Sequence, residues 1–424
     1  MIKFLLLFLE VLCITPSAVA YVDPGTGSML FSIVLCSITT IFFLLRIILI
    51  KCKQCLFFKK SISSVKHQFV VYSEGNQYHS VFKPVLDEFE FRKIPVMYYS
   101  SAVDDFIFKE KYNYVKSEYI GKGNKAYFKL AFLNSDICLM TTPQLNVLQL
   151  KRSKNVKHYA HILHSIGFSY SYRLFSLDYY DSVLCDADYQ VPMIRELEQK
   201  RKLPDKKLPV VGSTYMDFNQ QKLTNLKFKK ETNKYTILIA PTWGEESLLN
   251  KYGESLIDQF ISTEYNIIIR PHPHTLLIDK KLIDNLMQKY KNCPNISWDT
   301  SVENLKTMAI SDILLTDWSS VMLDYALLFN KTFLYTGTNT TNEMFDCYEL
   351  ENPAKWKYDM ISQIGKQLNS KDMNNLIQII NHVKNDHTYK KKLTQASSYF
   401  WAHKGKSAKK VVDFLIDIQK SFYG

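Results

Sequence analysis

Three short segments in the second half of the sequence contain residue types that bind phosphate. They are Pro241-Thr242-Trp243, Arg270-Pro271-His272-Pro273 and Asp317-Trp318-Ser319-Ser320. An arginine can hold two phosphate oxygens at once, and a histidine can hydrogen-bond or neutralise another. An apolar helical pattern follows Ser320, so the free N–H groups of the first helical turn and the two serine hydroxyls could bind a further oxygen. Together the segments predict a diphosphate site.

Each of these residues also has an ordinary structural explanation. Ser319 or Ser320 could be a helix N-cap, Arg270 a salt-bridge partner, and His272 a surface turn residue. Asp317 and Asp324 stand seven positions apart, one on the turn and one inside the helix, so they form no compact acidic cluster. No metal site is therefore predicted, and the phosphate site depends on all three segments meeting.

A histidine in the first half is the candidate for proton transfer. The run from Lys157 to Leu163 is typical of a strand and leads into His164. On a strand, His158 and His164 lie on one face and His161 on the other, which does not favour a zinc cluster. A neutral His164 at the end of the strand could take a proton from an incoming hydroxyl. The alternative is a histidine of the core or the surface.

The elements that must position these residues alternate between strands and helices. Strand-like runs occupy residues 67–72, 94–98, 137–140, 157–163, 182–185, 208–212, 235–240, 265–269, 295–298, 313–315 and 331–335. Helical patterns lie between most of them, which predicts parallel βαβ units. The polar stretch 219–234 is the expected linker or surface excursion. The fold class is α/β, with two doubly wound, Rossmann-like domains that face a cleft.

The first fifty residues predict a membrane anchor. Residues 4–14 are apolar, and Ala18-Val19-Ala20 follows, as in a cleaved secretory signal or a first membrane helix. Residues 29–50 are long and apolar enough to span a bilayer. The positive residues after this segment are Lys51, Lys53, Lys59 and Lys60. They mark the cytoplasmic side, so the large body of the protein is expected in the cytoplasm.

Composition narrows the choice of partners. The 424 residues carry a net charge of +12, which favours an anionic partner such as a membrane surface, a nucleotide or a polyanion. Nucleic-acid recognition is not expected, because no long basic run, zinc-finger pattern or RNP-like motif occurs. Cys52 and Cys55 form the one close cysteine pair, without a second pair to complete a zinc site. The scattered cysteines fit a reducing compartment.

Several of these segments resemble the CDP-glycerol glycerophosphotransferases, the teichoic-acid primases and polymerases. The stretch 311–335 resembles that family's strand-turn-helix signature, 239–243 its Ala-Pro-Thr-Trp segment, and 270–273 its Arg-x-His-Pro segment. Leu163-His164-Ser165 falls where the family has Trp-His-Gly, and 405–408 near its late Gly-Lys-Ala segment. Two departures are Ser165 in place of glycine and the missing Pro-Arg in 213–215. The Tyr21 to Ser28 loop is similar to a segment of bacterial membrane-anchored proteins.

The resemblance implies a GT-B fold and a role for each candidate residue. His164 would be the general base, and Arg270, His272, Ser319 and Ser320 would hold the diphosphate of a CDP-linked donor. We accordingly expect His164 and His272 to be catalytic. The expected phosphate- or nucleotide-binding residues are Arg270, Thr242, Asp317, Ser319, Ser320 and Asp324. No cofactor is expected.

The sequence thus predicts a transferase in the bacterial cytoplasmic (inner) membrane. It would move glycerol phosphate, or a related polyol phosphate, from a CDP-linked donor to a lipid-linked or polymeric glycan acceptor and release CMP, in the synthesis of a cell-envelope polymer. The expected domains are an anchor at 1–60, an acceptor domain at 61–212 and a nucleotide-binding domain with C-terminal helices at 213–424. Two alternatives remain: a glycosyltransferase of the same fold that uses a nucleotide sugar, and a non-catalytic, membrane-tethered binder of anionic polymer.

Overall fold

The computed structural model describes residues 24–58, 65–167, 172–226, 228, 230, 233–301, 303–337, 345–351 and 355–424. For residues 24–31, 50–58 and 355–359 only the course of the backbone is described. The predicted signal segment at residues 1–20 lies outside these ranges. The chain divides into two compact units, Met1–Ser64 and Val65–Gly424, and each is considered by itself.

The described residues of the first unit form the long helix α2 (Pro24–Phe58). Within it, Ser32–Leu49 is long and apolar enough to cross a membrane, judged by length and composition. The large apolar side chains between Ile33 and Leu49 are exposed. This stretch lies inside the apolar run 29–50 in the sequence.

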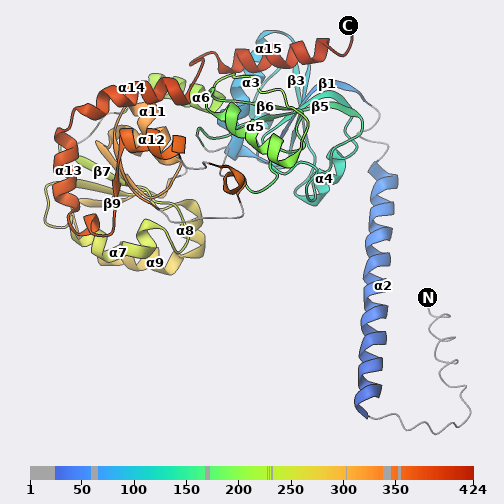
Figure 1. Ribbon diagram of the computed structural model, residues 1–424, viewed down its shortest axis with the longest axis horizontal. Coiled ribbons are helices and arrows are strands. Elements are labelled where there is room, and N and C mark those ends of the chain that lie inside the picture. Colours follow the sequence, from blue (N-terminus) through green and yellow to red (C-terminus); the bar gives the residue numbers. More distant parts are fainter. Residues whose placement is uncertain are drawn as a thin grey trace, which may run out of the picture. The chain divides into compact units, whose positions relative to one another are not determined.

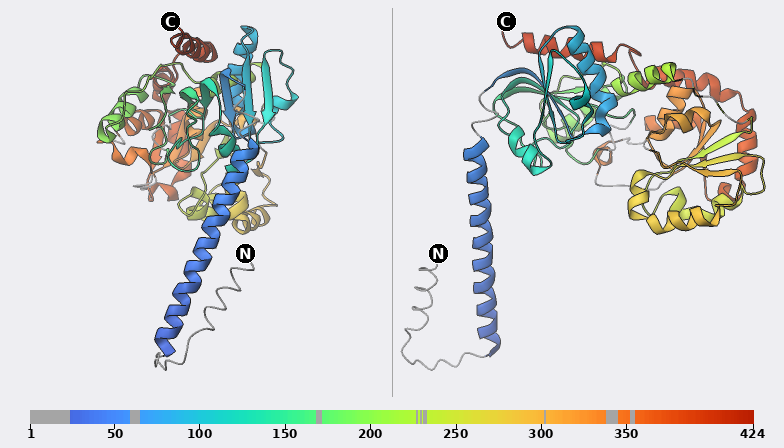
Figure 2. Two further views of the ribbon diagram at one scale, coloured as in Figure 1. Left: turned by 90° about the vertical axis from the view of Figure 1, so that its right-hand side faces the viewer. Right: turned by 180° about the vertical axis from the view of Figure 1, so that it is seen from behind.

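The second unit contains two parallel six-stranded sheets (Figures 1 and 2). The strands of the first sheet are β1 (His67–Ser73), β2 (Val96–Ser100), β3 (Val115–Tyr119), β4 (Ser135–Met140), β5 (Val156–Ile162) and β6 (Ser182–Leu184). Those of the second are β7 (Thr236–Ile239), β8 (Asn266–Ile269), β9 (Ile296–Trp298), β10 (Ile313–Thr316), β11 (Phe333–Thr336) and β12 (Gly365–Leu368).

Both sheets have the strand order of a doubly wound fold. The first is ordered β3-β2-β1-β4-β5-β6 and the second β12-β11-β10-β7-β8-β9. In each sheet the order reverses once, between β1 and β4 in the first and between β7 and β10 in the second. Ligands of such sheets bind beyond the carboxyl ends of the strands at the reversal. The predicted α/β class with two doubly wound halves is confirmed.

Helices cover the sheets. In chain order they are α3 (His79–Phe91), α4 (Asn124–Leu130), α5 (Gln190–Arg201), α6 (Thr214–Asn225), α7 (Leu248–Asp258), α8 (Pro273–Ile278), α9 (Lys280–Lys289), α10 (Leu305–Ile310), α11 (Val321–Phe329), α12 (Lys355–Ile364), α13 (Leu376–Asn385), α14 (Thr388–Phe400) and α15 (Ser407–Lys420). Helices α7 and α9 lie on one side of the second sheet, and α11, α12 and α14 on the other (Figure 1).

The strands of the second sheet are buried on both faces. Ile237 and Ile239 of β7 belong to one hydrophobic core with α7 and α9, while Leu238 between them belongs to another core with α10 and α11. Successive side chains of a strand point to opposite faces, so a continuous apolar run suits a sheet covered on both sides.

The last helix packs on the first sheet rather than on the second. Val411, Val412 and Leu415 of α15 share a hydrophobic core with Phe69 of β1 and Phe82 of α3. Asp217 of α6 fixes the turn before α15, because its carboxylate accepts hydrogen bonds from the backbone N–H groups of Gly405 and Ser407 at 2.7 and 2.9 Å and from the Trp401 indole N–H at 3.0 Å. The chain therefore returns to its first sheet at its C-terminal end.

Two local predictions are wrong. Residues 208–212 form no strand. The isolated bridges Ser182–Lys207 and Cys185–Val210, with their backbone hydrogen bonds, join this region to the first sheet. Pro209 has no N–H group to donate to a ladder, which limits pairing there. The expected linker at 219–234 is helical as far as Asn225, because residues 214–225 form α6.

Candidate active site

The three predicted phosphate segments lie at the carboxyl ends of neighbouring strands. Register pairs Ile239 of β7 with Ile269 of β8 and with Leu315 of β10. The Arg270 N–H donates to the Ile239 carbonyl at 2.8 Å, and the Ala240 N–H donates to the Leu315 carbonyl at 3.0 Å. The segments after β7, β8 and β10 therefore share one edge of the sheet, and two of them border the point where strand order reverses.

The Asp317 carboxylate holds two of these segments together. Its buried carboxylate accepts a hydrogen bond from the Thr242 N–H at 2.8 Å and another from the Leu248 N–H at 2.9 Å. Burial raises the pKa of Asp317, and these backbone donors oppose the shift. The carboxylate thus ties the loop after β7 to the end of β10. Thr242 and Asp317 are brought together, with Asp317 acting as a brace of the loop.

Arg270 and His272 follow β8 but face different partners. One Arg270 nitrogen (Nη1) donates to the Asp299 carboxylate at 2.5 Å, and the other (Nη2) donates to the Ser301 carbonyl at 2.7 Å. His272 caps α8, because its Nδ1 accepts from the His274 N–H at 3.1 Å. The His272 and His274 rings stack at 5.6 Å between centroids. Burial, and then the charge of His274, lower the pKa of His272.

The residues at the start of α11 fall into two groups. The Ser319 hydroxyl oxygen accepts from the Val321 N–H at 3.4 Å, and Ser320 is exposed at the helix N-terminus. Asp324 lies one turn further on and is buried, where its carboxylate accepts from the Tyr215 hydroxyl at 2.8 Å. Burial raises the pKa of Asp324 to about 6. Of the predicted residues here, the two serines stand at the helix N-terminus and Asp324 does not.

His164 follows β5 at the carboxyl end of the first sheet. Its Nδ1 lies 3.0 Å from the Thr141 hydroxyl, just beyond β4, and 3.1 Å from the Tyr172 hydroxyl. Its ring also packs edge-on against Tyr78, 5.3 Å between centroids. Burial lowers the pKa of His164 to about 4, so the ring is neutral at pH 7. A neutral imidazole held through one nitrogen can accept a proton at the other.

Sequence reasoning missed Thr141 and Tyr172. Thr141 had a usable signal, since it directly follows a predicted strand. Tyr172 had none, because it lies in an irregular stretch between β5 and β6.

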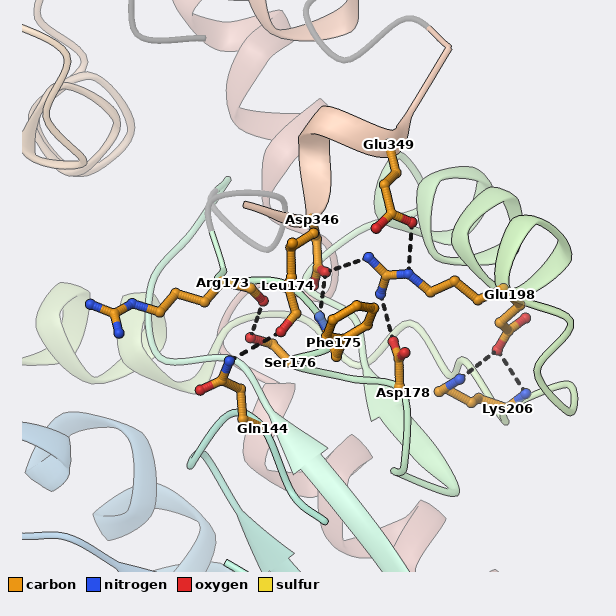
Figure 3. A network of polar contacts seen from close by, with 11 residues as sticks. Gln144, Arg173, Leu174, Phe175, Ser176, Asp178, Glu198, Lys206, Asp346 and Glu349 are labelled. Atoms are coloured by element: carbon orange, nitrogen blue, oxygen red, sulfur yellow. Dashed lines mark hydrogen bonds and ion pairs between the residues drawn. The ribbon is translucent and has the colours of Figure 1, made fainter. Parts of the chain in front are cut away.

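A buried ion-pair network joins the stretch that carries Tyr172 to the second half of the chain (Figure 3). The Arg201 guanidinium contacts Asp178 at 2.6 Å, Asp346 at 2.7 Å and Glu349 at 2.8 Å. The Asp346 N–H donates to the Tyr172 carbonyl at 2.8 Å. Its carboxylate accepts from the Phe175 N–H, also at 2.8 Å. We call Arg201 and its three carboxylates the Arg201 clamp.

Comparison with known structures shows the fold class. The wall teichoic acid polymerase TagF, soaked with CDPG, is 16% identical, with a TM-score of 0.53 over 91% of this chain and 98% of that one. The S. aureus MnaA–UDP structure is 14% identical, with a TM-score of 0.57 over 83% and 97%. The Neisseria meningitidis UDP-GlcNAc 2-epimerase is 15% identical, with a TM-score of 0.52 over 83% and 100%. The comparison with curated proteins finds no match.

These likenesses and the two doubly wound sheets define a GT-B-like protein. Residues 214–417 match the model of the CDP-glycerol:poly(glycerophosphate) glycerophosphotransferase family. The matched region contains the whole second sheet and all three phosphate segments. This match confirms the resemblance seen in the sequence, and it supports a transferase that is like the CDP-glycerol glycerophosphotransferases.

Proposed function

We propose that the protein transfers glycerol phosphate, or a related polyol phosphate, from a CDP-linked donor to a lipid-linked or polymeric glycan, in the synthesis of a teichoic-acid-like polymer of the cell envelope. The family match over residues 214–417 carries this proposal. The TagF likeness supports the polymer class, since that protein is a wall teichoic acid polymerase.

In the proposed reaction an acceptor hydroxyl attacks the β-phosphorus of the donor. A bond forms between the acceptor oxygen and that phosphorus, the bond from the phosphorus to the bridging oxygen breaks, and CMP leaves with the bridging oxygen. The hydroxyl proton passes to Nε2 of His164. Support comes from the buried, neutral ring and from the two hydroxyls that occupy its Nδ1. A positioned base of this kind contributes about 100-fold or more to the rate.

The donor diphosphate would bind at the edge formed by the loops after β7, β8 and β10. We assign its oxygens to His272, Arg270, Ser319, Ser320 and the N-terminus of α11. Positive and hydrogen-bonding groups there would stabilise the charge that develops on the transferring phosphoryl group. Thr242, Asp317 and Asp324 would support this site, the first two by shaping the loop after β7. Arg270 would divide its donors between Asp299 and the phosphate.

We further propose that α2 anchors the enzyme in the cytoplasmic membrane with the second unit in the cytoplasm. The apolar stretch Ser32–Leu49 has the length and composition for a span. The lysines that follow it in the sequence favour the cytoplasmic side. An anchored enzyme would meet a lipid-linked acceptor at the membrane surface.

The test is CMP release by the full chain in detergent micelles with a crude membrane acceptor. CDP-glycerol, CDP-ribitol and nucleotide sugars are offered separately. Release from a CDP-polyol alone is expected. Release only from nucleotide sugars would overturn the reaction in favour of a glycosyltransferase, and no release together with tight polymer binding would favour a non-catalytic binder.

His164→Ala tests the base. It should lower kcat at least about 100-fold while leaving CDP affinity, measured by calorimetry, unchanged. His158→Ala is the matched control, because His158 is a buried histidine of β5, the strand that precedes His164, and its Nε2 pairs with the Ser182 hydroxyl at 2.9 Å. Turnover retained by His164→Ala would remove His164 as the base.

A further inference from the structure

A second buried histidine reaches His164 through a tyrosine. The Tyr172 hydroxyl lies 3.1 Å from Nδ1 of His164 and 3.3 Å from Nε2 of His161. His161 is fully buried, and its pKa is lowered to about 3 by burial and then by His164, so it is neutral. Its ring packs edge-on against Tyr172 and Tyr180, with centroids 5.6 and 4.8 Å apart.

His161 has no role in the chemistry described so far. It lies inside the first sheet on β5, and its Nδ1 is a buried atom without a hydrogen-bond partner in the described part of the chain. A buried polar atom left in this way costs free energy, so a histidine at such a site calls for an explanation. Within the described residues, the one hydrogen bond of the His161 side chain is to the Tyr172 hydroxyl.

Counting protons around Nδ1 of His164 gives that explanation. Two hydroxyl oxygens, from Thr141 and Tyr172, stand at 3.0 and 3.1 Å from the same ring nitrogen. One N–H group can be shared between two acceptors, whereas a ring nitrogen has one lone pair to offer two donors. The arrangement therefore suits a proton on Nδ1. The Tyr172 hydroxyl proton then needs another acceptor, and Nε2 of His161 is in reach.

We propose that His161 and Tyr172 are positioning residues that hold His164 as the tautomer with its proton on Nδ1. His161 accepts the Tyr172 hydroxyl proton, and this turns the Tyr172 oxygen toward the N–H of His164. Nε2 of His164 is thereby left with a free lone pair for the acceptor hydroxyl. The inference deepens the proposed function and rests on it for the role of His164. Neither positioning residue is required to touch substrate.

The test reads the tautomers directly. The full chain is labelled with ¹⁵N-histidine in detergent micelles, and long-range ¹H–¹⁵N spectra show which ring nitrogen carries the proton. The His164 signals are identified by their loss in His164→Gln. In the wild type the proton of His164 is expected on Nδ1. In His161→Phe the Tyr172 proton turns to His164, so the Nε2-protonated tautomer of His164 is expected to appear.

Kinetics provide the second readout. His161→Phe should lower kcat for CMP release about ten-fold or more, with the donor KM within about two-fold, because the base and not the binding site is altered. His161→Gln should restore both readouts, since its amide oxygen can accept the Tyr172 proton. His158→Phe, on the same strand, should change neither. If His161→Phe does not fold, Tyr172→Phe replaces it. With only the Thr141 hydroxyl left at Nδ1, the preference for a proton there is lost, so a share of the Nε2-protonated tautomer is expected.

Two results would overturn the inference. One is a wild-type His164 protonated on Nε2, and the other is a His164 tautomer that is unchanged in both His161→Phe and Tyr172→Phe. Failure of the reaction itself is separate. If the wild type releases no CMP from any CDP-polyol while the tautomers respond as expected, the proton arrangement stands and the proposed function fails.

Discussion

Replacing Arg201 by methionine should destabilise the protein strongly and in a pH-dependent way. The Arg201 side chain is 8% exposed and pairs with Asp346 and Asp178, whose side chains are 2% and 9% exposed. Its third partner, Glu349, is 30% exposed, so solvent screens that pair and its contribution is small. The substitution keeps the apolar stem of the side chain and removes the one cation that these carboxylates share.

The size of the expected loss of stability follows from the burial of the ion pairs. Removing one partner of a buried ion pair costs about 3–5 kcal/mol, because the other charge stays buried without compensation. Asp346 can escape part of this cost by taking up a proton. Burial already raises its pKa to about 6, and Arg201 opposes that rise, so the variant's Asp346 has a higher pKa still. A group whose folded pKa is raised stabilises the folded state most in acid and loses that stability as pH increases.

The loss of stability on substitution should therefore be larger at pH 8 than at pH 5, by at least about 1 kcal/mol. Urea unfolding of the full chain in detergent, followed by tryptophan fluorescence, measures both values. Arg195→Met on the same helix is the control. Arg195 is 36% exposed and pairs with Glu198, which Lys206 also contacts, so a loss of about 1 kcal/mol or less is expected.

An equal loss at the two pH values, or a loss no larger than that of Arg195→Met, would refute the reasoning. The clamp also bears on activity. Asp346 holds the backbone of Tyr172, and the Tyr172 hydroxyl contacts His164. Arg201→Met should therefore lower kcat for CMP release more than Arg195→Met does.

Three further substitutions test the scaffold by urea unfolding. Gly212 has φ +87°, and an added Cβ would lie 2.3 Å from the Ala402 carbonyl oxygen. Gly212→Ala should therefore lower the free energy of unfolding by about 2 kcal/mol or more. An unchanged midpoint of urea unfolding would contradict this. Burial raises the pKa of Asp186 to about 8, so the wild type loses stability between about pH 4 and pH 8. Asp186→Asn lacks that loss and should be more stable than wild type at pH 8, with an advantage that is smaller at pH 5 and disappears below about pH 4. An advantage independent of pH would argue against burial as its cause. Asp317→Asn places an amide NH₂ group against the backbone N–H of Leu248 or of Thr242. The free energy of unfolding should fall by about 2 kcal/mol, and the donor KM should rise. Wild-type values of both would show that the Asp317 carboxylate is dispensable.

The sequence by itself predicted the interior strands and the edge on which the phosphate segments meet. Buried parallel strands are continuous apolar runs, as in 313–315 and 237–239, so composition reveals them. Segments that follow such strands share the carboxyl edge by topology alone, which is why Thr242, Arg270 and Ser319 could be grouped without coordinates. The edge strands β3 and β12 were missed, because Val115 alone is buried in β3 and the two central residues of β12 are exposed, which leaves no apolar run.

Tertiary structure alone decided which side chains meet across long separations. Helix α15 returns to the first sheet because its apolar face completes the core over β1 and α3. Asp346 lies 174 positions beyond Tyr172 in the sequence yet donates to its carbonyl. Asp317 and Asp324 both have carboxylates that could serve a ligand, and only burial shows that each is held by groups of the protein itself. Local patterns encode secondary structure, whereas the neighbours of His164 depend on how packed layers bring distant residues together.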